Sequence, residues 1–229
     1  MNETTLREQI CEIGRQMHRF QFADGTSGNI SARLPDGTIL MTPSGLAKGF
    51  MYPEQLIIVD TDGNRLDEPT PANADLHPTS ESLMHLEAYK KRPDVGGVIH
   101  AHPPHAVALT IAGLSPQTYT LPETLLLMGE VPVTPYATPA SAENRDAITD
   151  LIEDHDAILL AYHGSLTVGA DVWKAYMVLE TLEHAAHIIT LVHALGGGPD
   201  LPPEQLDKLR ALGKGYNVVN PAGRYVKQP

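Results

Sequence analysis

The sequence predicts one α/β domain in which helices flank a mixed or antiparallel sheet. With 229 residues, of which 42% are hydrophobic, the chain is long enough to bury a full core. Segments with helical spacing of apolar residues alternate with short β-branched runs, and the turn at 35–37 joins two of these runs as in an antiparallel hairpin. No repeat, low-complexity segment or linker divides the chain. We therefore expect a single domain over 1–229, with a core of about 5–215 and a tail over 216–229.

The first half of the chain begins with a helical pattern. Residues 4–22 place apolar side chains at three- and four-residue steps, which predicts an amphipathic helix. The expected strands of this half are 29–34, 37–42 and 53–60. Segment 67–80 is polar and rich in proline, so we expect a loop. It leads into a helix over 81–92, for which Thr79 or Ser80 is the expected N-cap.

The second half continues the alternation of strands and helices. The expected strands are 95–102, 131–134 and two short runs around a His-Gly turn within 157–169. The expected helices are 105–113, 141–154, 171–195 and one near 203–213. Ser141 is the expected cap of the second of these helices. The glycine run 196–198, followed by a proline, ends the third.

Charge and cysteine content limit the classes of function. The net charge is −12, from 16 basic and 28 acidic residues, which argues against nonspecific binding to nucleic acid or to an anionic membrane. Cys11 is the only cysteine, so an intrachain disulfide is excluded and a reducing compartment is favoured. The amino-terminal segment is polar, and no apolar run approaches the length of a membrane span. The expected localisation is cytoplasmic.

Three histidines lie within the stretch VIHAHPPHAV. His100 and His102 are two residues apart at the end of an expected strand, so their side chains point to the same face, about 6–7 Å apart along the chain. A divalent ion between them is one interpretation, and a solvated pair at a strand end is the other. Spacing alone favours the solvated pair. His105 follows two prolines and need not share their direction.

Further ligands would have to come from other segments. His163 lies in a turn between apolar runs, and Glu81 opens a helix whose N-terminus would stabilise its carboxylate. Taken alone, the first is more often structural and the second an ordinary first-turn acid. Three imidazoles and a carboxylate together would suit Zn²⁺ or another borderline divalent ion. His184 and His187 form a helical i,i+3 pair for which a surface or core-edge position is the commoner interpretation, and His77 is a weak candidate near Glu81.

Three short segments rich in glycine and hydroxyl side chains are candidates for binding an anion. GTSGN at 25–29 and TPSG at 42–45 flank the arms of the expected hairpin, and PTSE at 78–81 precedes a helix. Exposed backbone N–H groups and helix N-termini bind oxyanions. Each segment alone is more simply a turn or a cap. The sequence contains no P-loop or dinucleotide-binding pattern, so nucleotide chemistry is not expected.

Taken together and in order, GTSGNIS, TPSG, PTSE, HAHPPH and YHG resemble the class II aldolase/adducin family, and most closely its L-fuculose-1-phosphate aldolase-like enzymes. The resemblance covers roughly residues 5–215. It implies a three-layer α/β/α fold with a central, mostly antiparallel sheet. It also implies a homotetramer with active sites at subunit interfaces, acting on a small phosphorylated sugar, with no nucleic-acid or membrane partner.

The resemblance also implies roles for individual residues. Histidines matching His100, His102 and His163 hold Zn²⁺, with Mn²⁺, Co²⁺ and Fe²⁺ as alternatives, and Glu81 matches the glutamate that ligates the metal and then acts as acid and base. The residues that match the phosphate site are Thr26, Gly28, Asn29, Ser44, Gly45, Thr79 and Ser80. Tyr216 is the nearest match to a catalytic tyrosine that enters a neighbouring subunit's site.

The expected activity is that of a class II aldehyde-lyase. It would cleave a fuculose-, 5-deoxyribulose- or methylthioribulose-type ketose 1-phosphate to dihydroxyacetone phosphate and an aldehyde. A pentulose-phosphate 4-epimerase and a sugar-acid phosphate decarboxylase are the alternatives, although the epimerases carry aspartate at the position of Glu81. A non-catalytic adducin-like module is disfavoured because all four metal-ligand positions are kept.

Two segments depart from the family pattern. No clear equivalent of the product-protonating tyrosine lies between 118 and 132, where Tyr119 and Glu123 are candidates. The run 125–128 is apolar and would suit an apolar aldehyde if it faced the pocket, but core packing is its commoner role. The third-histidine motif is YHG, where HHG or NHG is more usual in the family.

Overall fold

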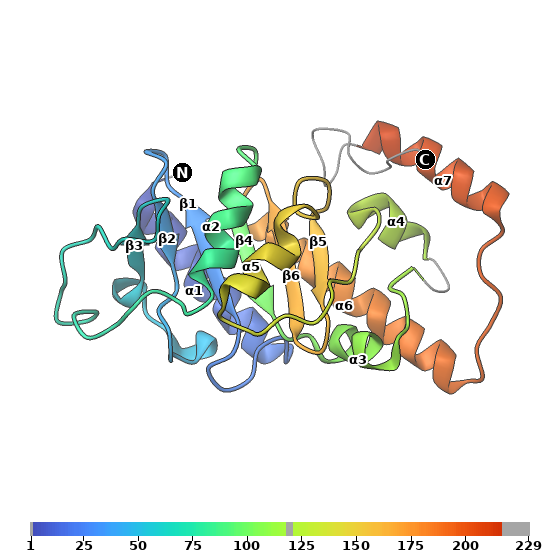
Figure 1. The fold of residues 1–229 in the computed structure, drawn as a ribbon, viewed down its shortest axis with the longest axis horizontal. Helices are drawn as coiled ribbons and strands as arrows, with labels where there is room; N and C mark the ends of the chain where they lie inside the picture. The colour runs from blue at the N-terminus through green and yellow to red at the C-terminus, as the bar shows by residue number, and fades with distance from the viewer. Residues whose placement is uncertain (1, 118–120, 217–229) are drawn as a thin grey trace.

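The computed structural model of the chain describes residues 2–117 and 121–216, with side chains as far as Leu212. Six strands form one sheet in the order β3-β2-β1-β4-β6-β5, and every neighbouring pair is antiparallel. The strands are β1 (Asn29–Arg33), β2 (Ile39–Met41), β3 (Ile57–Val59), β4 (Gly97–Ala101), β5 (Ala157–Leu160) and β6 (Gly164–Gly169). Figure 1 shows the helices arranged around this sheet, and the predicted α/β fold class is confirmed.

Helices cover both faces of the sheet. The α-helices are α1 (Glu3–Arg19), α2 (Ser82–Lys91), α3 (Pro104–Ala112), α4 (Pro122–Met128), α5 (Ala142–Thr149), α6 (Val172–Ala194) and α7 (Pro203–Tyr216), with short 3₁₀ turns at Lys48–Phe50 and Pro53–Gln55. On one face α1, α3 and α6 pack on the sheet, and on the other α2 and α5 do so. The result is three layers, with a hydrophobic core on each side of the sheet.

The pairing of β4 with its neighbours determines where the chemistry gathers. β4 lies between β1 and β6, and the register places Asn29 opposite His100 on one side and Leu166 opposite it on the other. The loop before β1 and the turn between β5 and β6 therefore meet at the carboxyl end of β4. Residues distant in sequence are brought to one end of the sheet.

One expected strand is absent from the described residues, and one helix that was not expected is present. The strand predicted at 131–134 is wrong: Val133 forms only an isolated parallel bridge to Leu159. Pro132 and Pro135 lack the N–H groups that a ladder requires, which explains why this segment does not pair further. Helix α4 was not expected, and it begins with Pro122, a residue favoured in the first helical turn.

Several helix boundaries also differ. The N-cap of α2 is Glu81, not Thr79 or Ser80, because an isolated bridge between Pro43 and Pro78 holds the preceding chain extended. The Thr79 side chain instead accepts a hydrogen bond from the Glu81 backbone N–H (3.4 Å). Helix α1 ends at Arg19, three residues earlier than expected, and α5 ends at Thr149. Ser141 occupies the N-cap position of α5 as predicted.

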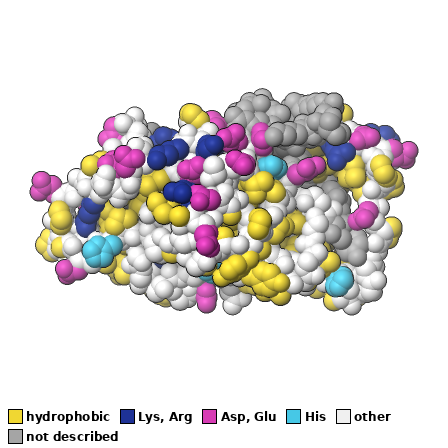
Figure 2. All heavy atoms as spheres, viewed as in Figure 1, with side chains coloured by type: hydrophobic (Ala, Val, Ile, Leu, Met, Phe, Trp, Pro, Cys, Tyr) yellow, Lys and Arg dark blue, Asp and Glu magenta, His cyan; other side chains and the backbone are white. Residues whose placement is uncertain are grey.

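Figure 2 shows the surface of one face of the molecule. Acidic side chains are scattered over it, and the lysines and arginines of the described residues form no continuous basic patch on this face. This agrees with the net charge of −12. Within 2–117 and 121–216, no helix has both the length and the apolar character needed to cross a membrane.

Candidate metal and anion site

The first two histidines of the site come from the end of β4. His100 is fully buried, and its Nδ1–H donates to the Ser165 carbonyl of β6 (2.9 Å). That bond leaves the lone pair of Nε2 free, and this atom lies 2.9 Å from Nε2 of His102. His102 is held by its own backbone N–H, which donates to the Phe22 carbonyl (2.8 Å). Both imidazoles are thus oriented by the sheet and by the chain that follows α1.

The third histidine comes from the turn between β5 and β6. The His163 ring centroid lies 4.7 Å from that of His100 and 5.0 Å from that of His102, and one ligand nitrogen from each ring lies within 4.8 Å of the others. Gly164 makes this approach possible, because a Cβ there would lie 2.4 Å from the Ala101 carbonyl oxygen and 2.9 Å from the His100 ring. The structure therefore brings together the three predicted metal-ligating histidines.

Glu81 completes the cluster from the start of α2. Its Oε2 accepts a hydrogen bond from Asn29 Nδ2 (2.8 Å) and lies 3.1 Å from His100 Nε2. Its Oε1 lies 3.5 Å from His163 Nε2 and is buried without a hydrogen-bond partner among the described residues. Burial alone would raise the pKa of Glu81, but the neighbouring His100, Asn29 and His163 more than offset this and hold it well below its usual range. The carboxyl group is ionised.

The charge states of this cluster fit a divalent cation. Burial, followed by the neighbouring His100, lowers the pKa of both His102 and His163 to about 4, so both rings are neutral near pH 7 and present lone pairs. Neutral imidazoles converging on a carboxylate with an unpaired buried oxygen form the donor set that zinc and similar borderline ions prefer. The residues present fit such an ion.

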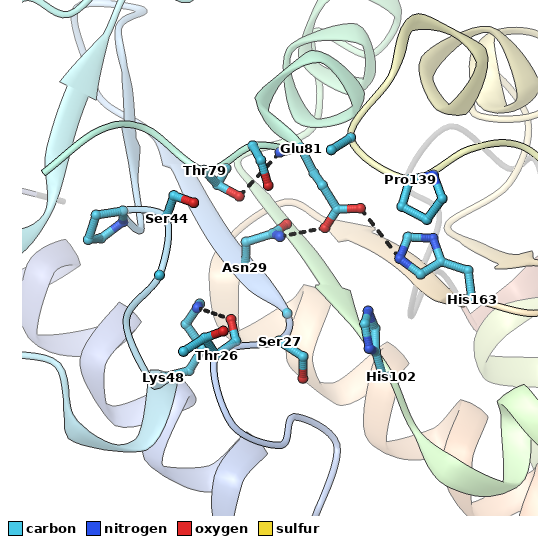
Figure 3. A pocket seen from close by; sticks show the side chains of 15 residues that line it. Thr26, Ser27, Asn29, Ser44, Lys48, Thr79, Glu81, His102, Pro139 and His163 are labelled. Carbon is cyan, nitrogen blue, oxygen red and sulfur yellow. Dashed lines mark hydrogen bonds and ion pairs between the residues drawn. The ribbon is translucent and has the colours of Figure 1, made fainter.

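A cavity of about 220 Å³ opens beside this cluster, and Figure 3 shows its lining. All seven residues that match the family's phosphate site line it: Thr26, Gly28, Asn29, Ser44, Gly45, Thr79 and Ser80. Gly28 and Gly45 have φ of +70° and +77°, conformations that favour glycine. The Ser44 N–H donates to the His77 carbonyl (2.9 Å), which keeps the second and third segments side by side. Hydroxyl and backbone groups thus surround the space next to Glu81.

Lys48 also lines this cavity, and sequence reasoning missed it. It is the only lysine or arginine among the described lining residues, and it is almost fully buried (3% exposed). Its Nζ donates to the carbonyl oxygens of Thr26 (2.9 Å) and Leu46 (2.5 Å), which leaves one of its three N–H groups for a ligand. Burial lowers the pKa of Lys48 to about 8, although Glu81 opposes the shift. An ammonium group at the cavity wall would attract an anion.

The backbone near the site contains unusual conformations. Gln21, Ala140 and Tyr162 are non-glycine residues with φ of +61°, +58° and +60°. Ala140 lines the cavity, and Tyr162 directly precedes His163. Gln21 precedes the residue whose carbonyl holds His102. Such conformations cost about 1–3 kcal/mol each and cluster at functional sites.

The other histidine candidates lie elsewhere. His105 Nδ1 lies 2.6 Å from Glu183 Oε1, and its ring stacks on that of His187 with centroids 4.1 Å apart. His77 is exposed and does not line the cavity, and His184 belongs to α6. None of these residues joins the metal cluster among the described residues.

The remaining predicted residues fall in α4, in α7 or outside the described part. Glu123 is an exposed residue of the first turn of α4 and does not line the cavity. In the apolar run 125–128, Leu125 and Met128 are buried and Leu127 packs against the core, which is the core-packing role. Tyr119 lies outside the described residues. Tyr216 ends α7, and its side chain also lies outside the described part.

Comparison with known proteins adds relatives that span nearly the whole chain. The family described as class II aldolase and adducin N-terminal domain matches residues 8–190. The 3-oxo-tetronate 4-phosphate decarboxylase of Escherichia coli (strain K12) is 32% identical over 194 residues, which cover 83% of this chain and 88% of that protein.

Two further relatives carry aldolase names. The 5-deoxy-D-ribulose 1-phosphate aldolase of Bacillus thuringiensis serovar kurstaki is 31% identical over 212 residues, which cover 92% of this chain and 96% of that protein. The solved structure of an L-fuculose 1-phosphate aldolase superposes with a TM-score of 0.78 at 26% identity, covering 90% of this chain and 94% of the other.

Proposed function

Because the chain belongs to the class II aldolase and adducin family, we propose that it is a metal-dependent aldolase that splits a ketose 1-phosphate into dihydroxyacetone phosphate and an aldehyde. The observation that carries the proposal is one cavity lined by two different kinds of group. Glu81, His102 and His163 form one part of its wall, and His100 lies directly behind them. Hydroxyl and glycine residues with Lys48 form another part. A sugar phosphate has matching parts, an oxygen-rich reacting end and a dianionic end.

The imidazoles and Glu81 lie at the end of the cavity where the reacting part of the sugar would bind. His100, His102, His163 and the resting Glu81 would hold Zn²⁺, with Mn²⁺, Co²⁺ or Fe²⁺ as alternatives, and such an ion supplies Lewis-acid polarisation of the ketose carbonyl. Asn29 holds Oε2 of Glu81 and leaves Oε1 as the oxygen available to a proton. The hydrogen bond from Asn29 therefore orients the Glu81 carboxylate toward the position of the sugar.

The proposed reaction is a retro-aldol cleavage. Glu81 takes the proton of the hydroxyl group on C4, the C3–C4 bond breaks, and its electron pair stays on C3 as the enediolate of dihydroxyacetone phosphate. The oxygen on C4 becomes the carbonyl of the released aldehyde. Return of a proton to C3 completes the product, and the protonated Glu81 is placed to supply it, so proton and electron pair balance.

The other end of the cavity would hold the phosphate. The hydroxyls of Thr26, Ser44, Thr79 and Ser80 and the backbone N–H groups around Gly28 and Gly45 are hydrogen-bond donors. The amino end of α2 and the ammonium group of Lys48 add positive potential in an acidic protein. Fixing the phosphate at one end keeps the C3–C4 bond next to Glu81.

Decarboxylation of a sugar-acid phosphate is the second candidate. It is favoured by the 32% identity to an enzyme named 3-oxo-tetronate 4-phosphate decarboxylase. Loss of CO₂ from a 3-oxo acid also leaves an electron pair next to a carbonyl, so the same cavity would serve. The two reactions differ in whether the bond that breaks releases an aldehyde or CO₂.

A coupled assay distinguishes these reactions. Metal-loaded protein is incubated with a panel of ketose 1-phosphates of the fuculose, 5-deoxyribulose and methylthioribulose types, and dihydroxyacetone phosphate is detected. In parallel, CO₂ release is measured with 3-oxo acid 4-phosphates. Dihydroxyacetone phosphate from a ketose 1-phosphate supports the aldolase. CO₂ from a 3-oxo acid 4-phosphate, with no cleavage of any ketose 1-phosphate, supports the decarboxylase. Absence of both products across the panel would favour a binding module without catalysis.

We also propose a homotetramer with active sites at subunit interfaces, located in the cytoplasm. Large hydrophobic side chains are exposed close to the site, including Tyr162 beside His163 and Tyr136 in the segment before Pro139 (62% and 64% exposed). Exposed apolar groups of this kind are typical of protein interfaces. Light scattering after gel filtration tests the assembly, and a monomer at micromolar concentration would contradict it.

A further inference from the structure

A chain of buried hydrogen bonds runs from Glu81 into the core between α2 and β1. Asn29 Nδ2 donates to Glu81 Oε2 (2.8 Å), and Asn29 Oδ1 lies 2.5 Å from His85 Nε2. His85 Nδ1 lies 2.7 Å from Ser31 Oγ, which lies 3.0 Å from Tyr89 Oη. The four residues behind Glu81 are at most 4% exposed, so solvent does not compete for these bonds.

Strand and helix geometry explain why these residues meet. Asn29 and Ser31 are two apart on β1 and point to the same face of the sheet. His85 and Tyr89 are four apart on α2 and lie on the helix face that packs there. The two pairs interlock so that each polar group on the strand meets one on the helix. His85 is therefore part of the support beneath the site, although it touches neither the cavity nor the metal cluster.

The direction of the bonds is fixed from the Glu81 end. Asn29 donates from its Nδ2–H₂ to Glu81 Oε2, so its Oδ1 faces His85. His85 Nε2 is therefore the donor. Burial, and then the neighbouring His100, lowers the pKa of His85 to about 3, so the ring is neutral and carries this single N–H. Its Nδ1 must then accept.

The far end of the chain follows the same direction. The Ser31 hydroxyl has one hydrogen, which it donates to His85 Nδ1, so the Tyr89 O–H is the donor to Ser31 Oγ. Every bond points toward Glu81, and each buried group in the series has a partner.

We propose that His85 is a positioning residue, which holds the Asn29 amide in the orientation that donates to Oε2 of Glu81 and so leaves Oε1 for the metal and the substrate proton. Without the His85 donor, Asn29 Oδ1 is a buried acceptor that has lost this partner, and the amide is held on the Glu81 side alone, so its hydrogen bond to Oε2 is no longer fixed in place. The expected effect of His85 on turnover rests on the proposed function. The hydrogen-bond arrangement from Tyr89 to Glu81 does not depend on it.

A purely structural role predicts a different outcome. A buried neutral histidine supported by four other polar groups is more costly to assemble than a well-packed apolar cluster. If His85 only filled space, an apolar residue of similar size would preserve the site. If it positions Glu81, the loss appears in metal affinity and turnover while substrate binding at the phosphate end is kept.

The test compares His85→Leu with His85→Gln, whose terminal amide is able to donate to Asn29. For each folded variant we measure kcat and KM on the substrate found by the coupled assay, and Zn²⁺ affinity by competition with a chelator. We expect His85→Leu to lose about 10–100-fold in kcat or in Zn²⁺ affinity with KM little changed, as for outer-shell partners of metal sites, and His85→Gln to recover most of it. His155→Leu is the matched control and should leave both quantities unchanged, because the ring of this half-buried histidine bonds, among the described residues, to the Leu151 carbonyl and lies outside the chain of bonds behind Glu81.

A spectroscopic measurement separates this inference from the proposed reaction. In ¹⁵N–¹H spectra of the labelled wild-type protein, His85 should be the Nε2–H tautomer with a slowly exchanging proton. The spectra and the Zn²⁺ competition test the positioning role of His85 even if no substrate in the coupled assay yields product. If His85→Leu does not fold, the Zn²⁺ affinity of His85→Gln and the tautomer of His85 in the wild-type protein still test this role. An Nδ1–H tautomer overturns the proposal, as does a folded Leu variant with kcat and Zn²⁺ affinity within about twofold of wild type.

Discussion

Replacing Lys48 by methionine should change how the stability of the protein depends on pH. The buried ammonium group has a pKa of about 8 in the folded protein, against 10.5 for a free lysine. This difference of 2.5 units corresponds to about 3 kcal/mol of folding free energy, because one unit is equivalent to about 1.4 kcal/mol. Lys48 is only 3% exposed, so solvent screening does not remove the effect.

The sign follows from the protons that each state binds. Between pH 8 and 10.5 the unfolded chain keeps the Lys48 proton and the folded protein has lost it, so the free energy of unfolding rises with pH over this window. Below pH 8 the full penalty of burying the charge is present. From about pH 7 to about pH 9.5 the contribution of Lys48 to stability should increase by about 2 kcal/mol. Methionine cannot titrate and removes this increase.

Urea unfolding of wild type and Lys48→Met at these two pH values measures the effect. The difference between the two proteins cancels the titration of all other groups. Lys90→Met, at a surface position in a long ion pair with Asp62, is the matched control. In the coupled assay, Lys48→Met should also raise KM by about 10- to 100-fold, since a charged hydrogen bond to phosphate is lost. A stability difference that is the same at both pH values would refute the assignment of a buried charge to Lys48.

Three further substitutions test the metal cluster. His100→Ala should remove bound metal and activity together, as measured by elemental analysis and the coupled assay; full activity in a metal-free variant would contradict the proposed site. Glu81→Gln should keep metal with weaker affinity but lose turnover by about 100-fold or more, the usual contribution of a general base, and a near-normal kcat would remove its role as base. Gly164→Ala should lower metal affinity in a folded protein, because its Cβ would lie 2.9 Å from ring atoms of His100 and His102; unchanged Zn²⁺ competition would show that the rings tolerate this Cβ and would contradict the reasoning.

The fold could be predicted to the extent that it depends on local pattern. Apolar periodicity located α1, α6 and the β1–β2 hairpin, and their positions differ from the expected ranges by only a few residues at the ends. The segment 131–134 has the composition of a strand, but its prolines limit it to a single bridge. Helix α4 was missed because its apolar run of four residues has no polar face to reveal a helical period.

The site could be predicted only in part from the residues themselves. The i,i+2 spacing gave a shared direction for His100 and His102, but not the approach of Glu81 or His163. That approach requires β1 and β6 to pair on either side of β4, a long-range arrangement that no local spacing encodes. The grouping of Glu81 and His163 with the two histidines was therefore predicted from the resemblance to a family and not from spacing.

Lys48 and His85 were missed for different physical reasons. Lys48 stands alone in a glycine-rich segment, and a single lysine there carries no pattern that would indicate burial. His85 did leave a signal: it lies four residues before Tyr89 on the buried face of α2, and Asn29 and Ser31 alternate on β1. Polar side chains on faces that should be apolar indicate that each has a partner.

The free energy of the site helps to explain its composition. A buried ammonium group, an unpaired carboxylate oxygen, neutral imidazoles with nitrogens as close as 2.9 Å and two residues with strained backbone next to them all oppose folding. None of them improves packing, so selection for stability alone would remove them. A cation among the imidazoles and an anion beside Lys48 would each give these groups a partner, and only in the folded state. The groups that oppose folding in the free chain are therefore the same groups that would bind metal and phosphate, which supports the proposal that the cavity is a site for both.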